Sequence, residues 1–296
     1  MESPRPALLD THVHLWNLDS STLSYDWLRP GIEYPVLGRL DRLRTPLYDA
    51  NAFEAEARFG HLCGVILVEA EAAAREEDPV DETRWFAAEA ASAGWTAGIV
   101  AHADLGSDDV GDQLARHVEA GPVRGIRDFT NAARLQQPDF LRGYSKLAHF
   151  ELVYDLDARW DHLSAARALA EAAPDVTLVV EHLAFPEERT DQYFDHWSVA
   201  MREVAGAPNV VCKISGLGMG DPRWTPDSMR PWVEHAISCF GAQRCMLGSN
   251  WPVDRMYSSY DALLHSYDVL TRHLTPSERE AVFNGTAQRV YRLTAR

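Results

Sequence analysis

The sequence lacks several features that would place it in a common class of protein. It has four cysteines among 296 residues, and none of them forms a C-x-x-C pair, a usage typical of free thiols in a reducing cytosol. No apolar run approaches membrane-spanning length, and the opening MESPRPALLD has no stretch long enough for a signal peptide. No G-x-G-x-x-G or Walker sequence occurs. We therefore expect a cytoplasmic protein without a nucleotide cofactor.

Basic residues are also few. The chain has 28 Lys and Arg against 44 Asp and Glu, which gives a formal net charge of -16. Such a surface repels phosphate backbones and anionic membranes, so neither a nucleic acid nor a membrane is expected as a partner. The acidic residues are spread along the chain, as on a solvated surface. These observations favour a small-molecule substrate.

Short β-branched runs that alternate with longer helical patterns are what the sequence does contain. The helical segments, such as DARWDHLSAARALAEAA, repeat their apolar residues every three or four positions. The expected strands are 7–13, 64–70, 96–102, 123–129, 151–156, 176–182, 209–215 and 244–250. Continuous apolar strands between helices indicate a parallel sheet covered on both sides. Eight such units predict one distorted TIM (β/α)8 barrel spanning residues 1–296.

Two segments depart from a minimal barrel. Residues 16–46 form a long connection without a clear period, and such loops are usually functional or disordered. Its aromatic residues argue against disorder, so we expect it to fold over the mouth of the barrel. From about residue 275 the chain predicts C-terminal helices, because Thr275-Pro276-Ser277-Glu278 has the pattern of a capping box.

The first strand ends in the pair His12 and His14, within LLDTHVHLWN. Residues two apart in a strand point to the same side and are roughly 7 Å apart. Two imidazoles at that spacing can bind one metal ion, each through a metal–nitrogen bond of about 2 Å. The carboxyl ends of barrel strands are also where active sites lie. The alternative is that the two histidines face solvent or a core position.

A third histidine, His182, ends the strand in VTLVVEHLAFP. Alone it would be read as structural. With His12 and His14 it could complete a site of three nitrogens with an open position, which is the set that catalytic zinc uses. The sequence therefore predicts a divalent metal site, most simply zinc.

Five motifs taken together resemble those of a known family. They are DTHVHLW, VRGIRDF, VVEHLAFP, NVVCKISGLG and RCMLGSNWPVD. In this order they resemble the lactonase-like branch of the amidohydrolase superfamily, which includes sugar-lactone hydrolases and pyrone dicarboxylate lactonase. The resemblance implies a distorted barrel, the hydrolysis of a small carbonyl ring, and His12, His14 and His182 as ligand or active-site residues. Barrels of this branch often associate through helices, so a homo-oligomer is compatible with it.

One position departs from the family pattern. Many members carry an aspartate at the end of the last strand, whereas this chain has Asn250, which is neutral and a poorer ligand. Three explanations stay open. A zinc ion held by the three histidines could itself lower the pKa of its water, so that a nearby group need only orient that water. Asp254 could swing in as the base, or the fold could have lost hydrolysis.

Charged residues within strands complete the candidate site. Arg127 in VRGIRDF could grip a carboxylate in two-point fashion or pair with a nearby acidic group. Lys213 lies in a strand that should be buried, and therefore needs an acidic partner, a carbonyl or the substrate. Glu69 could contact substrate or pair with Lys213 or Arg127. Tyr154, or its neighbour Asp155, could hydrogen-bond a ring hydroxyl.

Trp16 and Trp251 are expected to form walls of the cavity, with an ordinary core role as the alternative. The sequence thus predicts a hydrolase that opens a sugar lactone or a carboxylated lactone by water attack on the ring carbonyl. Lys213 or the metal would stabilise the developing oxyanion. Two alternatives remain open: a metal-dependent non-oxidative decarboxylase of the same superfamily, and a catalytically silent binding protein on the same barrel.

Overall fold

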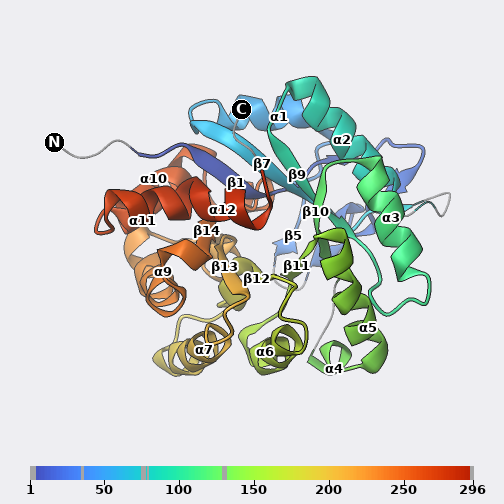
Figure 1. Ribbon diagram of the computed structural model, residues 1–296. Helices are drawn as coiled ribbons and strands as arrows, with labels where there is room; N and C mark the ends of the chain where they lie inside the picture. The colour runs from blue at the N-terminus through green and yellow to red at the C-terminus, as the bar shows by residue number, and fades with distance from the viewer. Residues whose placement is uncertain (1–4, 35–36, 75–77, 79, 129–131, 294–296) are drawn as a thin grey trace.

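The computed structural model describes residues 5–34, 37–74, 78, 80–128 and 132–293 (Figure 1). It confirms the predicted barrel, because eight parallel strands form one sheet in the order β1-β7-β9-β10-β11-β12-β13-β14. The strands are β1 (Leu8–Val13), β7 (Leu62–Val68), β9 (Ala97–His102), β10 (Val123–Arg127), β11 (Val153–Leu156), β12 (Leu178–Val180), β13 (Val210–Ile214) and β14 (Cys245–Leu247). Each falls within a few residues of its predicted range.

The seam between β1 and β14 is closed by single contacts instead of a continuous ladder. Val13 forms an isolated parallel bridge with Trp251, and the backbone N–H of His14 donates to the Trp251 carbonyl at 2.8 Å. Below these contacts, the Asp10 carboxylate accepts the backbone N–H of Ser249 at 2.8 Å. The barrel is therefore nearly closed, and its first and last strands meet where the histidines lie.

Helices surround the strands, most of them as an outer ring, while the last helix packs buried residues into the lower interior of the barrel (Figure 1). They are α1 (Ala50–Ala57), α2 (Asp81–Ala93), α3 (Val110–Ala120), α4 (Ala132–Leu135), α5 (Pro138–Lys146), α6 (Leu163–Ala172), α7 (Asp191–Val204), α8 (Leu217–Gly220), α9 (Pro226–Phe240), α10 (Tyr260–Thr271), α11 (Pro276–Glu280) and α12 (Thr286–Val290). Several begin at side-chain caps, and α11 has the reciprocal box of Thr275 and Glu278. Among the described residues, no helix is both long and apolar enough to span a bilayer.

Residues 16–46 fold into short pieces that dock on their surroundings. Three two-residue antiparallel pairs organise this region: β2 (Trp16–Asn17) with β6 (Leu47–Tyr48), β3 (Leu23–Ser24) with β8 (Ala73–Ala74), and β4 (Glu33–Tyr34) with β5 (Gly38–Arg39). The Trp27 indole donates to the Ala70 carbonyl at 2.7 Å. This contact joins the loop to the segment that follows β7, at the carboxyl end of the barrel.

The interior of the barrel is apolar in its lower part, toward the amino ends of the strands. Inward side chains such as Leu9, Val153, Val179 and Val211 form a buried cluster there. A second and larger apolar cluster lies between the strands and the helices. This packing makes the barrel wall rigid, so that residues at the carboxyl ends of the strands are held in fixed positions.

Candidate active site

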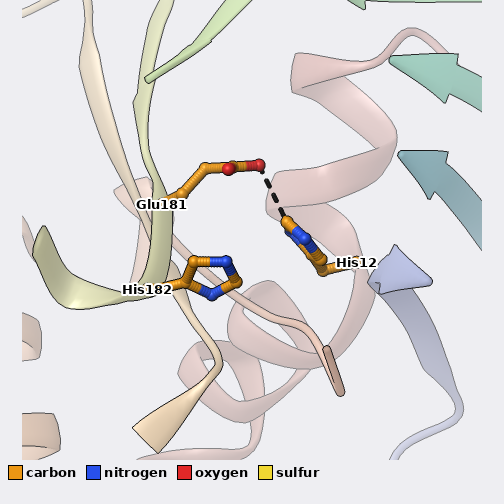
Figure 2. A group of neighbouring side chains, drawn as sticks. All are labelled: His12, Glu181 and His182. Atoms are coloured by element: carbon orange, nitrogen blue, oxygen red, sulfur yellow. Dashed lines mark ion pairs between the residues drawn. The ribbon is translucent and has the colours of Figure 1, made fainter. Parts of the chain in front are cut away.

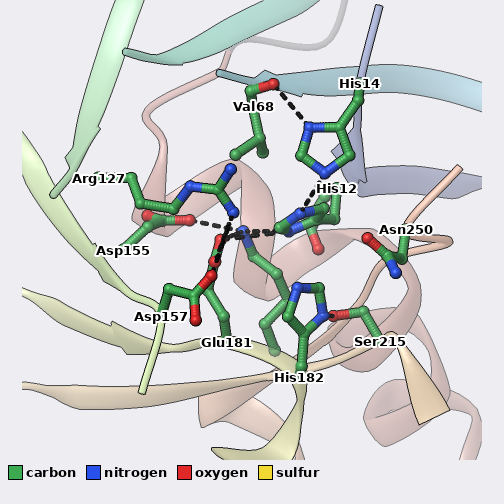
Figure 3. A network of polar contacts seen from close by, with 12 residues as sticks. His12, His14, Val68, Arg127, Asp155, Asp157, Glu181, His182, Ser215 and Asn250 are labelled. Atoms are coloured by element: carbon green, nitrogen blue, oxygen red, sulfur yellow. Dashed lines mark hydrogen bonds and ion pairs between the residues drawn. The ribbon is translucent and has the colours of Figure 1, made fainter. Parts of the chain in front are cut away.

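Three imidazoles from distant segments meet at the carboxyl end of the barrel (Figure 3). His12 lies in β1, His14 directly follows that strand, and His182 follows β12. The Nε2 atoms of His12 and His14 are 3.0 Å apart, and the ring centroids of His12 and His182 are 4.4 Å apart. All three side chains are buried. The structure thus brings together the three histidines that the sequence singles out.

The neighbours of His12 and His14 indicate where their protons lie. His14 Nδ1 faces the carbonyl oxygens of Val68 at 3.0 Å and Glu69 at 3.1 Å, so this nitrogen must carry a hydrogen. His12 Nδ1 lies 3.2 Å from Glu181 Oε1 and 3.4 Å from the Lys213 ammonium, and the closer carboxylate oxygen favours a hydrogen on this nitrogen as well. The two Nε2 lone pairs then face each other, an arrangement that a proton or a metal cation between them would stabilise.

Burial keeps these imidazoles neutral. It lowers the pKa of His14 to about 4, lowers the pKa of His182 to about 3, and holds the pKa of His12 well below its usual value. In His182 and His14, the positive charge of Arg127 acts in the same direction. Neutral imidazole is the form that accepts a proton or binds a metal ion, so all three rings are in that form at neutral pH.

His182 stands on an unusual stretch of backbone. His182, Leu183, Ala184 and Phe185 all have φ values between 50° and 55°, in the left-handed region. Helix α7 holds this turn, because the Trp197 indole donates to the Leu183 carbonyl at 2.7 Å. Left-handed conformations cost roughly 1–2 kcal/mol per residue, and such strain persists where the surroundings impose it. The turn therefore aims His182 at the other histidines against the preference of its own backbone.

The opposite side of the His182 ring meets the end of β13. His182 Nδ1 lies 2.9 Å from Ser215 Oγ. The next residue, Gly216, has a φ of 64°, and a Cβ atom there would lie 2.6 Å from His182 Nδ1. Only glycine satisfies both the backbone angle and the close approach. Ser215 and Gly216 together fix the orientation of the imidazole.

A layer of charged side chains lies beneath the histidines (Figure 3). The Lys213 ammonium donates to Asp155 at 2.5 Å and to Glu181 at 3.2 Å. The Arg127 guanidinium donates to Glu69 at 2.5 Å and to Glu181 at 3.1 Å. All five side chains are buried. Three carboxylates against two cations leave this layer with an excess of negative charge.

Glu181 is the centre of this layer and contacts His12 directly, at 3.2 Å from its Nδ1 (Figure 2). Burial would raise the pKa of its carboxyl group, but the Lys213 and Arg127 cations, together with the hydrogen bond from His12, hold that pKa well below its usual value. Among the described residues, His12, Glu181 and His182 form a group whose donor atoms all lie within 4.8 Å of one another. The predicted ligand set had His14 in place of Glu181, and His14 lies beside the same group.

Asn250 and Asp254 form a pair on the far side of the histidines. The Asn250 amide nitrogen donates to Asp254 Oδ1 at 3.1 Å, and the Asp254 side chain is buried. Burial raises the pKa of Asp254 to about 7. Asn250 lines the cavity, whereas Asp254 lies behind it. In this arrangement Asp254 orients the amide of Asn250 and does not line the cavity, whereas one of the three explanations left open by the sequence had Asp254 swing in as the base.

A cavity of about 210 Å³ opens above the histidines. His14, His182 and Asn250 form part of its floor, and Trp27 and Tyr34 of the 16–46 segment line it as well. Phe185, Met219 and Val253 contribute apolar surface, and Glu71, Asp157 and Glu187 contribute carboxyl groups. The only two arginines among its lining residues, Arg127 and Arg159, are both engaged in ion pairs, Arg159 with Glu187 at 3.0 Å.

Four predicted residues are placed differently from the sequence interpretation: Tyr154, Lys213, Trp16 and Trp251. Tyr154 faces the helices, where it packs against Tyr144 and donates to the Asp128 carbonyl at 3.1 Å. Its neighbour Asp155 is the inward residue. Lys213 is fully buried and contacts its carboxylate partners below the cavity. These placements correct the expectation that Tyr154 contacts a substrate and that Lys213 polarises its carbonyl.

Trp16 and Trp251, the two tryptophans expected to form cavity walls, lie outside the cavity. Trp16 is buried against Trp27 and Tyr48 and donates to the Thr45 carbonyl at 3.0 Å. Trp251 packs edge-on against Tyr260, behind the end of β14. Both therefore have the core role that was the alternative to forming a cavity wall. Glu69 and Arg127 contact each other, which is the pairing that the sequence left open, and Arg127 also lines the cavity.

Sequence reasoning missed Glu181 and Asp157, whereas the aromatic loop that it expected over the barrel mouth does supply Trp27 and Tyr34 to the cavity lining. Glu181 had a usable signal, because it directly precedes His182 and shares the inward phase of Val179 in strand β12. Asp157 holds the same phase after β11, and burial raises its pKa to about 7. Trp27 and Tyr34 gave no periodic signal, since they belong to a loop whose path depends on contacts with residues 70 and 71.

Comparison with known proteins agrees with this geometry. Residues 9–293 match the model of a family described as amidohydrolase. The chain belongs to this family. It is 28% identical over 302 residues to an L-fucono-1,5-lactonase of Burkholderia multivorans, and this match covers 96% of each chain. It is 32% identical over 228 residues to an L-fucono-1,5-lactonase of Burkholderia ambifaria, covering 72% of this chain and 76% of that one.

Solved structures extend the similarity to the fold. Two crystal structures of an amidohydrolase from Burkholderia multivorans, one with bound HEPES and one with bound zinc, match with a TM-score of 0.81 and 28% sequence identity. Each comparison covers 98% of this chain and 100% of the other. The predicted resemblance to the amidohydrolases is therefore confirmed at the level of family and fold.

Proposed function

We propose that this protein hydrolyses a small lactone by attack of water on the ring carbonyl. The observation that carries the proposal is the convergence of three neutral imidazoles at the carboxyl end of the barrel, where His14 and His182 line the cavity and His12 lies directly behind them. The names of two relatives, both L-fucono-1,5-lactonases, support a lactone as the substrate class. A cavity of about 210 Å³ suits a single small ring.

The donor atoms at the histidines fit a divalent metal ion. The Nε2 atoms of His12 and His14 face each other at 3.0 Å, and the Glu181 carboxylate beside them is a further candidate ligand, which leaves the His182 ring free of the ion. The excess negative charge of the layer below favours a cation at this place. Zinc, which prefers nitrogen and carboxylate ligands, is our proposal for the ion. It would supply a Lewis acid and lower the pKa of the attacking water.

The side chains on the cavity floor orient and deprotonate the water in this proposal. Asp254 holds the amide nitrogen of Asn250, so the amide oxygen lies on the side of the histidines (Figure 3) and accepts a hydrogen bond from the water. His182 Nδ1 is engaged by Ser215, which leaves Nε2 as the basic nitrogen of this neutral ring. Asn250 thus orients the attacking water, and the neutral imidazole of His182 takes its proton.

The charges that line the cavity favour an uncharged, hydroxylated ring over a carboxylated one. Glu71, Asp157 and Glu187 present carboxyl groups to it, whereas Arg127 and Arg159 are already paired with carboxylates. A substrate carboxylate would have to compete with these internal partners and would be repelled by the acidic rim. Hydroxyl groups, by contrast, can donate to the same carboxylates.

A screen with a pH indicator tests the proposal. Purified zinc-supplemented protein is mixed with uncharged aldonolactones and with carboxylated lactones, and the initial rate of acid release is recorded. We expect acid release from an uncharged lactone, with carboxylated lactones at least about 10-fold slower. Chelation of divalent ions is expected to lower the rate, and added zinc to restore it.

The same screen separates the alternatives. Release of CO2 from aromatic acids, without acid release from lactones, would identify a decarboxylase. Thermal stabilisation by a lactone without turnover would identify a binding protein. Either result would contradict the proposed hydrolysis.

A further inference from the structure

Helix α12 and the residues that follow it enter the barrel from the end opposite to the cavity. Ala287, Val290, Tyr291 and Leu293 belong to the apolar cluster that fills the lower interior. Tyr291 is fully buried there. Because Asp155 lies two residues beyond the interior residue Val153 on β11, it belongs to the next layer toward the cavity. Tyr291 therefore approaches the charged layer from below.

The Tyr291 hydroxyl is the one polar contact that this segment makes with the charged layer among the hydrogen bonds of the described residues. It lies 2.8 Å from Asp155 Oδ2 and 3.1 Å from Asp155 Oδ1. The Lys213 ammonium lies 5.6 Å from the centre of the Tyr291 ring, within cation–π range. Burial and the adjacent Asp155 hold the pKa of Tyr291 well above its usual value, so the hydroxyl remains a donor.

A continuous series of polar contacts leads from this hydroxyl to the cavity. Asp155 accepts from Tyr291 and from Lys213, and Lys213 also donates to Glu181 at 3.2 Å. Glu181 in turn contacts His12 Nδ1 at 3.2 Å. His12 then meets His14 at 3.0 Å through its other nitrogen. Each step joins fully or almost fully buried groups.

We propose that Tyr291 is a positioning residue of the active site, whose hydroxyl fixes the Asp155 carboxylate and through it Lys213, Glu181 and His12. Asp155 would otherwise be held only by Lys213 among the side-chain contacts described for it. A carboxylate free to rotate would let the ammonium shift between Asp155 and Glu181. Glu181 would then lose the fixed position that defines the orientation of the His12 ring. Partners directly behind the reacting groups typically matter 10–100-fold, and Tyr291, which acts through Asp155, Lys213 and Glu181, is expected at the lower end of that range.

Substitution of Tyr291 by phenylalanine tests the proposal, because it removes the hydroxyl and keeps the ring. Tyr144→Phe is the matched control: Tyr144 is also fully buried, and its hydroxyl has no hydrogen-bond partner in the part of the chain that the structure describes. For Tyr291→Phe we expect kcat to fall about 10-fold with KM within about twofold, whereas Tyr144→Phe keeps both wild-type values. Equal kcat values for the folded Tyr291→Phe variant and the control would contradict the proposal.

The kinetic readout rests on the proposed function, so a second readout avoids it. In metal-free protein labelled with 15N-histidine, NMR reports the protonation and hydrogen bonding of each ring nitrogen, with His12 assigned by a His12→Gln spectrum. We expect the His12 ring signals to shift in Tyr291→Phe and to stay in place in Tyr144→Phe. Unchanged His12 signals would overturn the proposal even if no lactone were hydrolysed, whereas a shift without lactonase activity would count only against the proposed function.

Asp155→Asn provides a second variant if Tyr291→Phe does not fold. It keeps an acceptor for Tyr291 and removes the charge that holds Lys213. The same fall in kcat and the same shift of the His12 signals are expected. A folded Asp155→Asn variant that matches wild type in both would overturn the proposal.

Discussion

The lower and upper halves of the barrel interior differ in chemistry although the same strands build both. A step of two residues along a strand keeps the side chain on the same face. On three neighbouring strands that step leads from an apolar residue to an ionised one, namely Val153 to Asp155, Val179 to Glu181 and Val211 to Lys213. The lower layer is ordinary core packing, and the upper layer is a set of ion pairs whose members have almost no contact with solvent.

The difference shows where the molecule departs from maximal stability. Removing charges from water is costly, and buried ion pairs often stabilise a protein no better than apolar residues of the same size. The apolar layer therefore accounts for stability. The charged layer is explained by what it supports, which is the placement of Glu181 and the three histidines.

Breaking the charged layer should have the largest effect on stability. Lys213→Met leaves Asp155 and Glu181 without their shared cation, and we expect the free energy of unfolding to fall by about 3–5 kcal/mol. Val211→Ala, two residues earlier in the apolar layer, should lower it by about 2 kcal/mol. Urea unfolding of both variants measures the two values. A Lys213→Met variant that is no less stable than Val211→Ala would refute the contrast between the layers.

The next largest effect concerns Asp254, a buried carboxyl group that, unlike Asp155, has no cationic partner among its described contacts. Its pKa of about 7 lies above the usual value of 3.8, so the folded state favours the protonated form. This raised pKa lowers stability progressively as the pH rises from about 4 through 7. Asp254→Asn removes this pH dependence, so its free energy of unfolding should exceed that of wild type by up to about 4 kcal/mol at pH 8.

Urea unfolding between pH 4 and pH 8 measures this difference. The exposed Asp175→Asn is the control, and its stability should follow wild type across the range. If the free energies of unfolding of wild type and Asp254→Asn differ by the same amount at pH 4 and pH 8, the interpretation of Asp254 as a buried acid without a cationic partner is wrong.

The smallest effect is expected when the same substitution is made in the strained turn and in a regular helix and the stabilities of the two variants are compared. Ala184 in the left-handed turn and Ala170 in α6 are both fully buried. Glycine tolerates a positive φ but weakens a helix by about 1 kcal/mol. We therefore expect Ala184→Gly to be more stable than Ala170→Gly by about 1–2 kcal/mol in thermal or urea unfolding. Equal stabilities would show that the turn stores no strain.

The sequence predicted the barrel and its histidines because both depend on local patterns. Eight apolar runs between helical segments determine the strand count, and His12, His14 and His182 occupy strand ends. Tyr154 was misplaced because side chains alternate along β11, where Asp155 shares the inward face of Val153 and Tyr154 takes the outward face. The pairing of Lys213 with Asp155 joins residues 58 positions apart, and no local pattern specifies such a contact.

Other features left no trace in the sequence. The left-handed turn at residues 182–185 contains no glycine, the residue that usually marks such a backbone. Its conformation comes from contacts with Tyr193 and Trp197 of α7. Trp16 and Trp251 were expected at the cavity because of their position next to functional residues, yet their rings fill the space behind it.

The central claim is that the converging imidazoles at the upper end of the barrel form the hydrolytic centre. It is tested most directly by the rate of acid release from an uncharged aldonolactone, measured for wild type, His182→Gln and the control His149→Gln, whose imidazole is exposed. The account predicts that His182→Gln loses at least about 100-fold in kcat/KM while folding as wild type does, and that His149→Gln keeps the wild-type rate. A folded His182→Gln variant that hydrolyses the lactone as fast as wild type would contradict it.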